Sequence, residues 1–183
     1  TQLDRARGIY RETQRRAREM ATLTEVGRDI SSSLEASTVL ESIVTHAKEL
    51  LNGDLSALFL PENEGQTFRA IAAIGIEAED LRNDMITLGK GILGNVAQNK
   101  VGEIVNDVKK DPRVISITGT EIDIHDHMLI VPMLANDDLI GLMSVWRTGA
   151  GLEFTDFELE FLNNLSRQAV IAVQNSQLFA QVQ

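Results

Sequence analysis

The clearest pattern in the chain is a pair of apolar runs between residues 127 and 147. Residues 128–134 are apolar, residues 136–138 are the turn formers Asn-Asp-Asp, and residues 139–146 are largely apolar again. Two such runs joined by a few turn residues predict a β-hairpin. Apolar side chains point to both faces of its second strand, so both faces of the sheet must be covered. Pro132 cannot donate to a ladder, but the pattern around it still predicts a strand.

Three further segments show the three- and four-residue spacing of apolar positions that predicts helices. The first runs to about residue 33, with a seam like that of a coiled coil. The residues of this seam are Met20, Leu23, Gly27, Ile30 and Leu34. The second helix is predicted to begin at Thr38, where Glu41 completes a capping box, and to end at Gly53. The third is predicted to begin at Thr155, whose capping partner is Glu158, and to continue to the end of the chain.

Shorter elements fill the middle of the chain. Apolar runs predict strands there, and segments bounded by glycine and polar residues predict short helices and a loop. The predicted strands are residues 55–60, 67–74, 85–88 and 102–105. The predicted helices are residues 75–83 and 91–100, and the long loop is residues 106–126. This order of elements predicts an α+β fold built around an antiparallel sheet.

The charge balance narrows the range of partners. Among 183 residues, 17 are Lys or Arg and 27 are Asp or Glu, which gives a net charge of −10. Nucleic acids and anionic membranes are bound by basic surfaces, so we expect neither as a partner. No apolar run is long enough for a membrane span and no signal peptide is recognisable, so we expect a cytoplasmic protein. Because the chain begins without methionine and ends in a helical pattern, we expect a piece of a longer protein.

Several kinds of chemistry can be weighed from the residue types. Cysteine is absent, which excludes disulfides, thiolate catalysis and zinc–thiolate sites. Gly89, Gly91 and Gly94 spell GxGxxG, but no βαβ unit surrounds them, so a dinucleotide site is disfavoured. Two interpretations remain for these glycines. They permit a tight turn with close helix packing, or they place a helix N-terminus against a polar or anionic group of a ligand.

A cluster of possible metal ligands lies at the end of the predicted loop. His125 and His127 alternate there with Asp123 and Asp126, and an extended chain places both histidines on one face. A His-x-His pair in a polar loop is usually solvated, so a metal or haem role is the alternative and not the main hypothesis. Trp146, the only tryptophan, is expected in the core. No Ser–His–acid order or pair of carboxylates stands out, so we expect no enzymatic activity.

Four segments in this order resemble the GAF domain family, over roughly residues 23–178. The segments are GxGIxGxVA at 89–97, ND to DPR at 106–113, MLIVPM with LIGL at 128–142, and FT with AxxAVxN at 154–175. The resemblance implies a six-stranded antiparallel sheet with the terminal helices packed on one face, where they often dimerise. Short helices and loops on the other face enclose a small-molecule pocket. It also implies a helical linker at 1–22, the GAF domain at 23–178 and the start of a second helical linker at 179–183.

The resemblance places the pocket, and the apolar spacing of the first and last helices places the dimer contact. The pocket is predicted to be lined by Ile92, Leu93 and Asn95 on its helix side, Ser116 and Thr118 in its roof, and Ile130 in its floor. The homodimer seam is predicted at Met20, Leu23, Ile30, Leu165, Ala169 and Ala172. Bilin attachment and methionine sulfoxide reduction use cysteine in this family, so neither is expected here.

The sequence therefore predicts a sensory or regulatory module without enzymatic activity. We expect it to bind an unidentified small molecule and to relay its state through the terminal helices to an output domain in the same chain. The alternative for the pocket is a collapsed, ligand-free space in which the predicted pocket residues are core. The alternative function is a haem- or metal-binding redox or gas sensor that uses His125 or His127.

Overall fold

The structure is a computed structural model that describes residues 2–23, 28–115, 121–123 and 125–181. Side chains are described for residues 2–14, 35–115, 121–123 and 125–176. No helix within these ranges combines the length and the apolar character that a membrane span needs.

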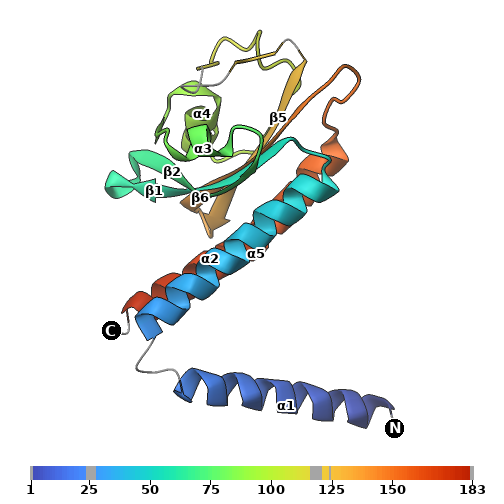
Figure 1. Cartoon of the computed structure of the whole chain (residues 1–183), viewed down its shortest axis with the longest axis vertical. Coiled ribbons are helices and arrows are strands. Elements are labelled where there is room, and N and C mark those ends of the chain that lie inside the picture. The colour runs from blue at the N-terminus through green and yellow to red at the C-terminus, as the bar shows by residue number, and fades with distance from the viewer. Residues whose placement is uncertain (1, 24–27, 116–120, 124, 182–183) are drawn as a thin grey trace.

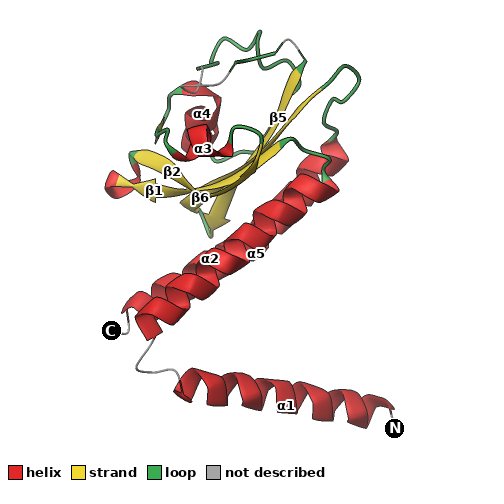
Figure 2. Ribbon diagram, viewed as in Figure 1, coloured by secondary structure: helices red, strands yellow, loops and turns green. Residues whose placement is uncertain are grey.

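Six antiparallel strands form one sheet in the order β3-β2-β1-β6-β5-β4 (Figure 2). Their bounds are Leu55–Glu62 for β1, Thr67–Gly75 for β2, Ile86–Thr87 for β3, Glu103–Val105 for β4, Asp126–Ala135 for β5 and Asp138–Thr148 for β6. Every pair in this order is antiparallel. The predicted α+β fold around a six-stranded antiparallel sheet is confirmed.

The hairpin of β5 and β6 is present where the apolar pattern predicts it, and β6 is one of the two central strands of the sheet. Its register pairs Met128 with Trp146 and Pro132 with Leu142. Pro132 is tolerated in a buried strand because β4 pairs only with residues 128–130 of β5. At the proline, β5 therefore has a neighbouring strand on one side only, as an edge strand does, and one missing N–H can be accommodated.

Helices cover both faces of the sheet (Figure 1). Helices α2 (Arg28–Leu50) and α5 (Asp156–Gln181) run side by side across one face, where Leu58, Met143 and Leu162 belong to a buried core. Helices α3 (Ala78–Arg82) and α4 (Gly91–Asn99) lie over the other face, above a second core that includes Phe59 and Leu142. The apolar pattern on both faces of β6 is explained by these two layers.

The predicted start of the second helix, Thr38, is wrong. Helix α1 spans Gln2–Leu23, and α2 already begins at Arg28, so Thr38 and Glu41 lie inside a helix and not at its N-terminus. No proline or glycine interrupts residues 28–50, so nothing in that segment stops the helix. The predicted C-terminus is confirmed, because the Gly53 N–H donates to the Lys48 carbonyl (2.8 Å), five residues back, as at a Schellman cap.

The predicted capping box of the last helix is present. The Glu158 N–H donates to Thr155 Oγ1 at 3.3 Å, and the Thr155 N–H donates to Glu158 Oε1 at 3.1 Å. Two otherwise unpaired N–H groups are thus satisfied, which fixes where α5 begins.

Candidate functional site

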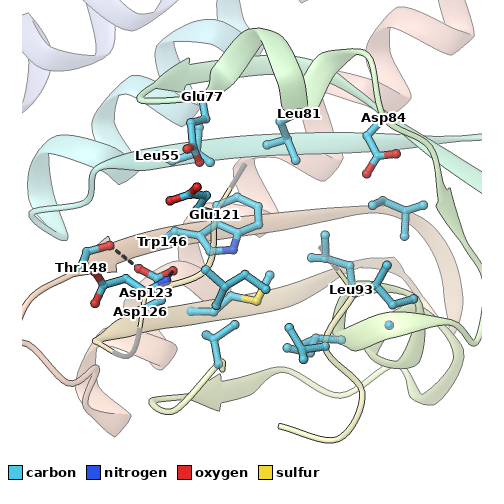
Figure 3. Close-up of a pocket in the computed structure, with 18 of the residues that line it drawn as sticks. Leu55, Glu77, Leu81, Asp84, Leu93, Glu121, Asp123, Asp126, Trp146 and Thr148 are labelled. Atoms are coloured by element: carbon cyan, nitrogen blue, oxygen red, sulfur yellow. Dashed lines mark hydrogen bonds between the residues drawn. The ribbon is translucent and has the colours of Figure 1, made fainter. Parts of the chain in front are cut away.

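A cavity of about 810 Å³ lies on the face of the sheet that α3 and α4 cover. Its floor includes Leu55, Met128 and Trp146 from β1, β5 and β6, and its helical wall includes Leu81 and Leu93 (Figure 3). Residues 114–115 and 121–123, which belong to the long loop before β5, also line the cavity. A concave, mostly apolar space of this size matches the sites that bind small molecules.

The mouth of the cavity exposes unusual amounts of apolar surface. Ile76, Met85 and Ile115 line the cavity and are 66%, 46% and 62% exposed. Three large apolar side chains that both line the cavity and reach solvent offer a contact surface for an apolar group.

One end of the cavity is strongly acidic. Glu77, Glu121, Asp123 and Asp126 gather there around the Trp146 ring, while Asp84 lies at the other end (Figure 3). Asp54 also lines the cavity.

Thr148 connects two of these carboxylates at the end of β6. Its N–H donates to Asp54 Oδ2 at 2.8 Å, and its hydroxyl donates a short hydrogen bond to Asp126 Oδ1. Asp126 Oδ2 also accepts the N–H of Asp123 at 2.7 Å. The start of β1, the end of β6 and the loop before β5 are therefore held together at the acidic end.

Glu77 is the most unusual of the acidic residues. Although Glu77 is exposed, partial desolvation and then repulsion from Asp80, Asp126 and Glu121 raise the pKa of its carboxyl group. Its backbone adopts φ 66°, a left-handed conformation that is costly for a residue with a side chain. Strain and like-charge repulsion at the mouth of a cavity are features that occur at functional sites.

Arg113 anchors the loop that covers the cavity. Its guanidinium group contacts Glu103 of β4 at 2.9 and 3.1 Å, and Asp111 at 3.0 and 2.9 Å. It also donates to Asn95 Oδ1 of α4 at 2.8 Å. The hydrogen bond from Arg113 is the main reason that the pKa of Asp111 is lowered. One side chain thus joins loop, helix and edge strand.

Comparison with known proteins decides the family. The family model described as GAF domain matches residues 33–174, most of the chain. The chain belongs to the GAF domain family. Members of this family are often regulatory or sensory modules that bind ligands. Among curated proteins, no match to this chain was found.

Solved structures show the same fold. The chain is similar to the GAF domain of a phosphoenolpyruvate-protein phosphotransferase from Coxiella burnetii, with 15% identity, a TM-score of 0.70, and 87% of this chain and 98% of that chain covered. The corresponding Acinetobacter domain has 17% identity, a TM-score of 0.68, and 85% and 96% coverage. The type II free methionine-R-sulfoxide reductase from Thermoplasma acidophilum has 15% identity, a TM-score of 0.65, and 79% and 96% coverage.

The predicted pocket residues of this GAF domain are only partly brought together. Ile92 and Leu93 line the cavity. Asn95 is not among the lining residues, because it points to Arg113, and Ile130 is fully buried in the core beneath. Ser116 and Thr118 lie outside the described residues.

Sequence analysis missed the polar part of the cavity. Asp54, Glu77 and Thr148 come from three distant segments, and no spacing in the sequence connects them. Trp146, which was expected in the core, is half-buried and lines the cavity. The sequence held no signal for this, because Trp146 pairs with Met128, which is itself buried, and paired residues of neighbouring strands share a face.

The GxGxxG segment of the GAF domain has a packing role. The Gly89 N–H donates to the Gly94 carbonyl at 2.8 Å, and a Cβ on Gly94 would lie 2.1 Å from the Thr87 carbonyl oxygen. Gly91 adopts φ 71°. These contacts support the tight turn with close packing, and the acidic lining does not favour an anion at this helix start.

The two histidines occupy different environments. His127 is buried, and its ring nitrogens Nδ1 and Nε2 both lie 2.8 Å from backbone carbonyls, those of Asn106 and Gly149. His125 is exposed. Within the described ranges, no group of three or more His, Cys, Asp or Glu residues is arranged to hold a metal ion. Both nitrogens of His127 are thus engaged in fixing the fold.

The predicted dimer residues fall into three groups. Side chains of Met20, Leu23 and Ile30 lie outside the described part of the structure. Ala169 is fully buried in the chain's own core, so it has no surface to offer a partner. Leu165 is half-buried beside that core, and Ala172 lines a shallow groove between α2 and α5. Val39 and Ile171, which are 45% and 58% exposed, line the same groove.

Proposed function

We propose that this GAF domain is a sensory or regulatory module without enzymatic activity, which binds a small molecule in the cavity and relays its state through α2 and α5. The observation that carries the proposal is the cavity on the face of the sheet opposite those helices. We further propose that it acts as a cytoplasmic homodimer and controls an output domain in the same chain. Nucleic acid and membrane are not among the proposed partners, since the net charge is −10.

The end of β6 supplies a physical connection between cavity and helices. Trp146 and Thr148 line the cavity, and Arg147 lies between them in sequence. Because neighbouring residues of a strand point to opposite faces, Arg147 reaches the helical side. There it donates to the Leu51 carbonyl at 2.7 Å, just after α2, and to Glu158 in the first turn of α5. A ligand that shifts Trp146 or Thr148 would therefore act on both helices.

The absence of enzymatic activity is supported by the residues present. One structural neighbour is named a methionine sulfoxide reductase, but the present chain contains no cysteine. The described residues of the cavity offer no nucleophile activated by a histidine, because neither His125 nor His127 is among those that line it. A haem or metal role for these histidines gains no support from their environments.

A compound screen tests the proposal. Thermal unfolding of the wild type and of Leu93→Trp would be followed with a library of amino acids, amines, nucleotides and carboxylic acids. A ligand at 100 times its Kd stabilises the folded state by about 2.7 kcal/mol. We expect a compound that raises Tm of the wild type and not of Leu93→Trp, because the indole occupies the site. Equal stabilisation of both proteins would place binding elsewhere.

The relay is measured on the same proteins. Since the chain has no cysteine, Gln174→Cys on the exposed surface of α5 gives one spin label per chain. We expect the label-to-label distance across the dimer to change when the compound binds, and to stay unchanged in Leu93→Trp. Binding that leaves this distance unchanged would contradict the relay.

A further inference from the structure

The charges that line the cavity select for one sign of ligand. Six carboxylates contribute to the lining, against a single ammonium group, that of Lys90. The carboxylates are Asp54, Glu77, Asp84, Glu121, Asp123 and Asp126. A cleft of one charge sign with apolar walls concentrates its field, so a cation is attracted into it and an anion is repelled.

We propose that the ligand of this cavity is an organic cation with an apolar body, and this rests on the proposed function. Its ammonium or guanidinium group lies at the acidic end, beside Glu77 and Glu121. Its apolar body extends along the cavity over Leu93 and out toward Ile115 at the mouth. The ligand class thus follows from an acidic end joined to an apolar floor and rim.

Trp146 supplies a second reason to expect a cation. Its ring lies in the acidic end of the cavity, close to the carboxylates of Glu77 and Glu121 (Figure 3). An indole face attracts a cation more strongly than any other aromatic side chain. The same ring gives apolar contact, so an ammonium group with attached carbon atoms satisfies both the ring and the carboxylates.

The carboxylates are suited to an organic cation more than to a metal ion. Asp54 and Asp126 already accept hydrogen bonds from Thr148. The side-chain carboxylates of Glu77 and Glu121 have no hydrogen-bonding or ion-pairing partner in the described part of the chain. No set of three or more acidic or histidine side chains there is close enough for metal coordination. Carboxylates that line an apolar space without converging on one point attract an organic cation but do not form the coordination shell of a metal ion.

The electrostatic environment of Glu77 also favours the binding of a cation. Partial desolvation and repulsion from Asp80, Asp126 and Glu121 disfavour its ionised form. A cation bound among these groups relieves the repulsion, so part of the binding free energy comes from charges that the fold already holds together.

Three probes with the same apolar body test the charge preference. They are phenethylammonium, the anion 3-phenylpropionate and the neutral 3-phenylpropanol. Trp146 is the only tryptophan, so its fluorescence reports the cavity directly. We expect saturable fluorescence changes, with phenethylammonium binding at least tenfold more tightly than either of the others. Raising the salt from 50 to 500 mM should weaken only the cation's binding severalfold, because screening removes the charge term.

A matched pair of variants locates the effect. Glu77→Gln with Glu121→Gln removes two charges at the cavity, and Glu49→Gln with Glu64→Gln removes two exposed charges outside it. The first pair should weaken phenethylammonium about tenfold and leave 3-phenylpropanol within twofold. The second pair should leave both within twofold.

The outcomes separate this inference from the proposed function. Equal binding of the three probes would overturn the cation preference while showing that the cavity does bind small molecules. Equal weakening by both variant pairs would also overturn it, since only overall charge would matter. If no probe changes the fluorescence, the cation inference fails, and the proposed function stands or falls on the compound screen.

Discussion

The guanidinium group of Arg147 forms a two-pronged ion pair with Glu158, with N–O distances of 2.7 and 3.0 Å. The same group donates to the carbonyls of Leu51, Leu152 and Glu153 and lies 3.9 Å above the Phe154 ring. Arg147 is almost fully buried. One side chain therefore fixes the end of β6 to both helices of the opposite layer.

Replacing this arginine should be strongly destabilising. Arg147→Met removes the positive partner of the Glu158 carboxylate and the donor to three carbonyls, and removing one partner of a buried pair costs about 3–5 kcal/mol. Urea unfolding followed by circular dichroism measures the change. Arg69→Met, which removes an exposed ion pair with Glu62, is the control and should cost less than about 1 kcal/mol. Equal costs would show that Arg147 is not the junction between the layers.

The ion pair also predicts a pH dependence. Burial alone would raise the pKa of Glu158, but hydrogen bonds from Arg147 and Thr155 outweigh it, so the pKa lies below its usual value of 4.5. A lowered pKa in the folded state stabilises the protein above pH 4.5, and this contribution is lost as the pH falls through the lowered value. The difference in unfolding free energy between wild type and Glu158→Gln should therefore be present at pH 7 and shrink in acid. A difference that grows in acid would contradict this sign.

Gly94 should tolerate no side chain. In Gly94→Ala the new Cβ would lie 2.1 Å from the Thr87 carbonyl, so the start of α4 must shift, which we expect to cost about 1–3 kcal/mol or more. Gly8→Ala is the matched change in a helix, with nothing within 4 Å of its Cβ. Chemical unfolding should show the loss for Gly94→Ala alone. A stable Gly94→Ala protein would mean that the close approach is not required.

The dimer proposal is tested at the groove of α2 and α5. Val39→Glu with Ile171→Glu places two charges on exposed apolar positions of this surface, and should convert the dimer to a monomer with the sheet still folded. Val101→Glu with Ile71→Glu makes the same changes on exposed positions outside the groove. Sedimentation velocity separates the two. A monomeric wild type, or dissociation by both pairs, would remove the proposal.

The fold was predictable where local pattern is sufficient. The β5–β6 hairpin and the capping box of Thr155 each depend on residues that are close together in the sequence, and both are found where predicted. The start of α2 was not predictable from Thr38 and Glu41, because a capping box identifies a helix start only where the preceding residues are not helical. Residues 28–37 contain no proline or glycine, so the helix can run through the capping-box sequence.

The candidate site was less predictable, because its residues meet only after folding. Ile92 and Leu93, which the family resemblance assigned to the pocket, do line the cavity. Asn95 is not among the lining residues, because its side chain accepts a hydrogen bond from Arg113, which lies eighteen residues away in the sequence. The acidic end could not be predicted because Asp54 and Asp126 are joined through Thr148 of a third segment.

The central claim is that open space, and not packed side chains, lies between the sheet and α4. The free energy of unfolding of Leu93→Trp, measured beside Leu142→Trp, tests it most directly. Both begin from leucine, but Leu93 lines the cavity and Leu142 is fully buried and does not. The indole should enter the cavity at a cost below about 1 kcal/mol, while overpacking at Leu142 should cost about 1–3 kcal/mol or more. Equal, large losses in both variants would contradict the claim that this GAF domain has a ligand cavity.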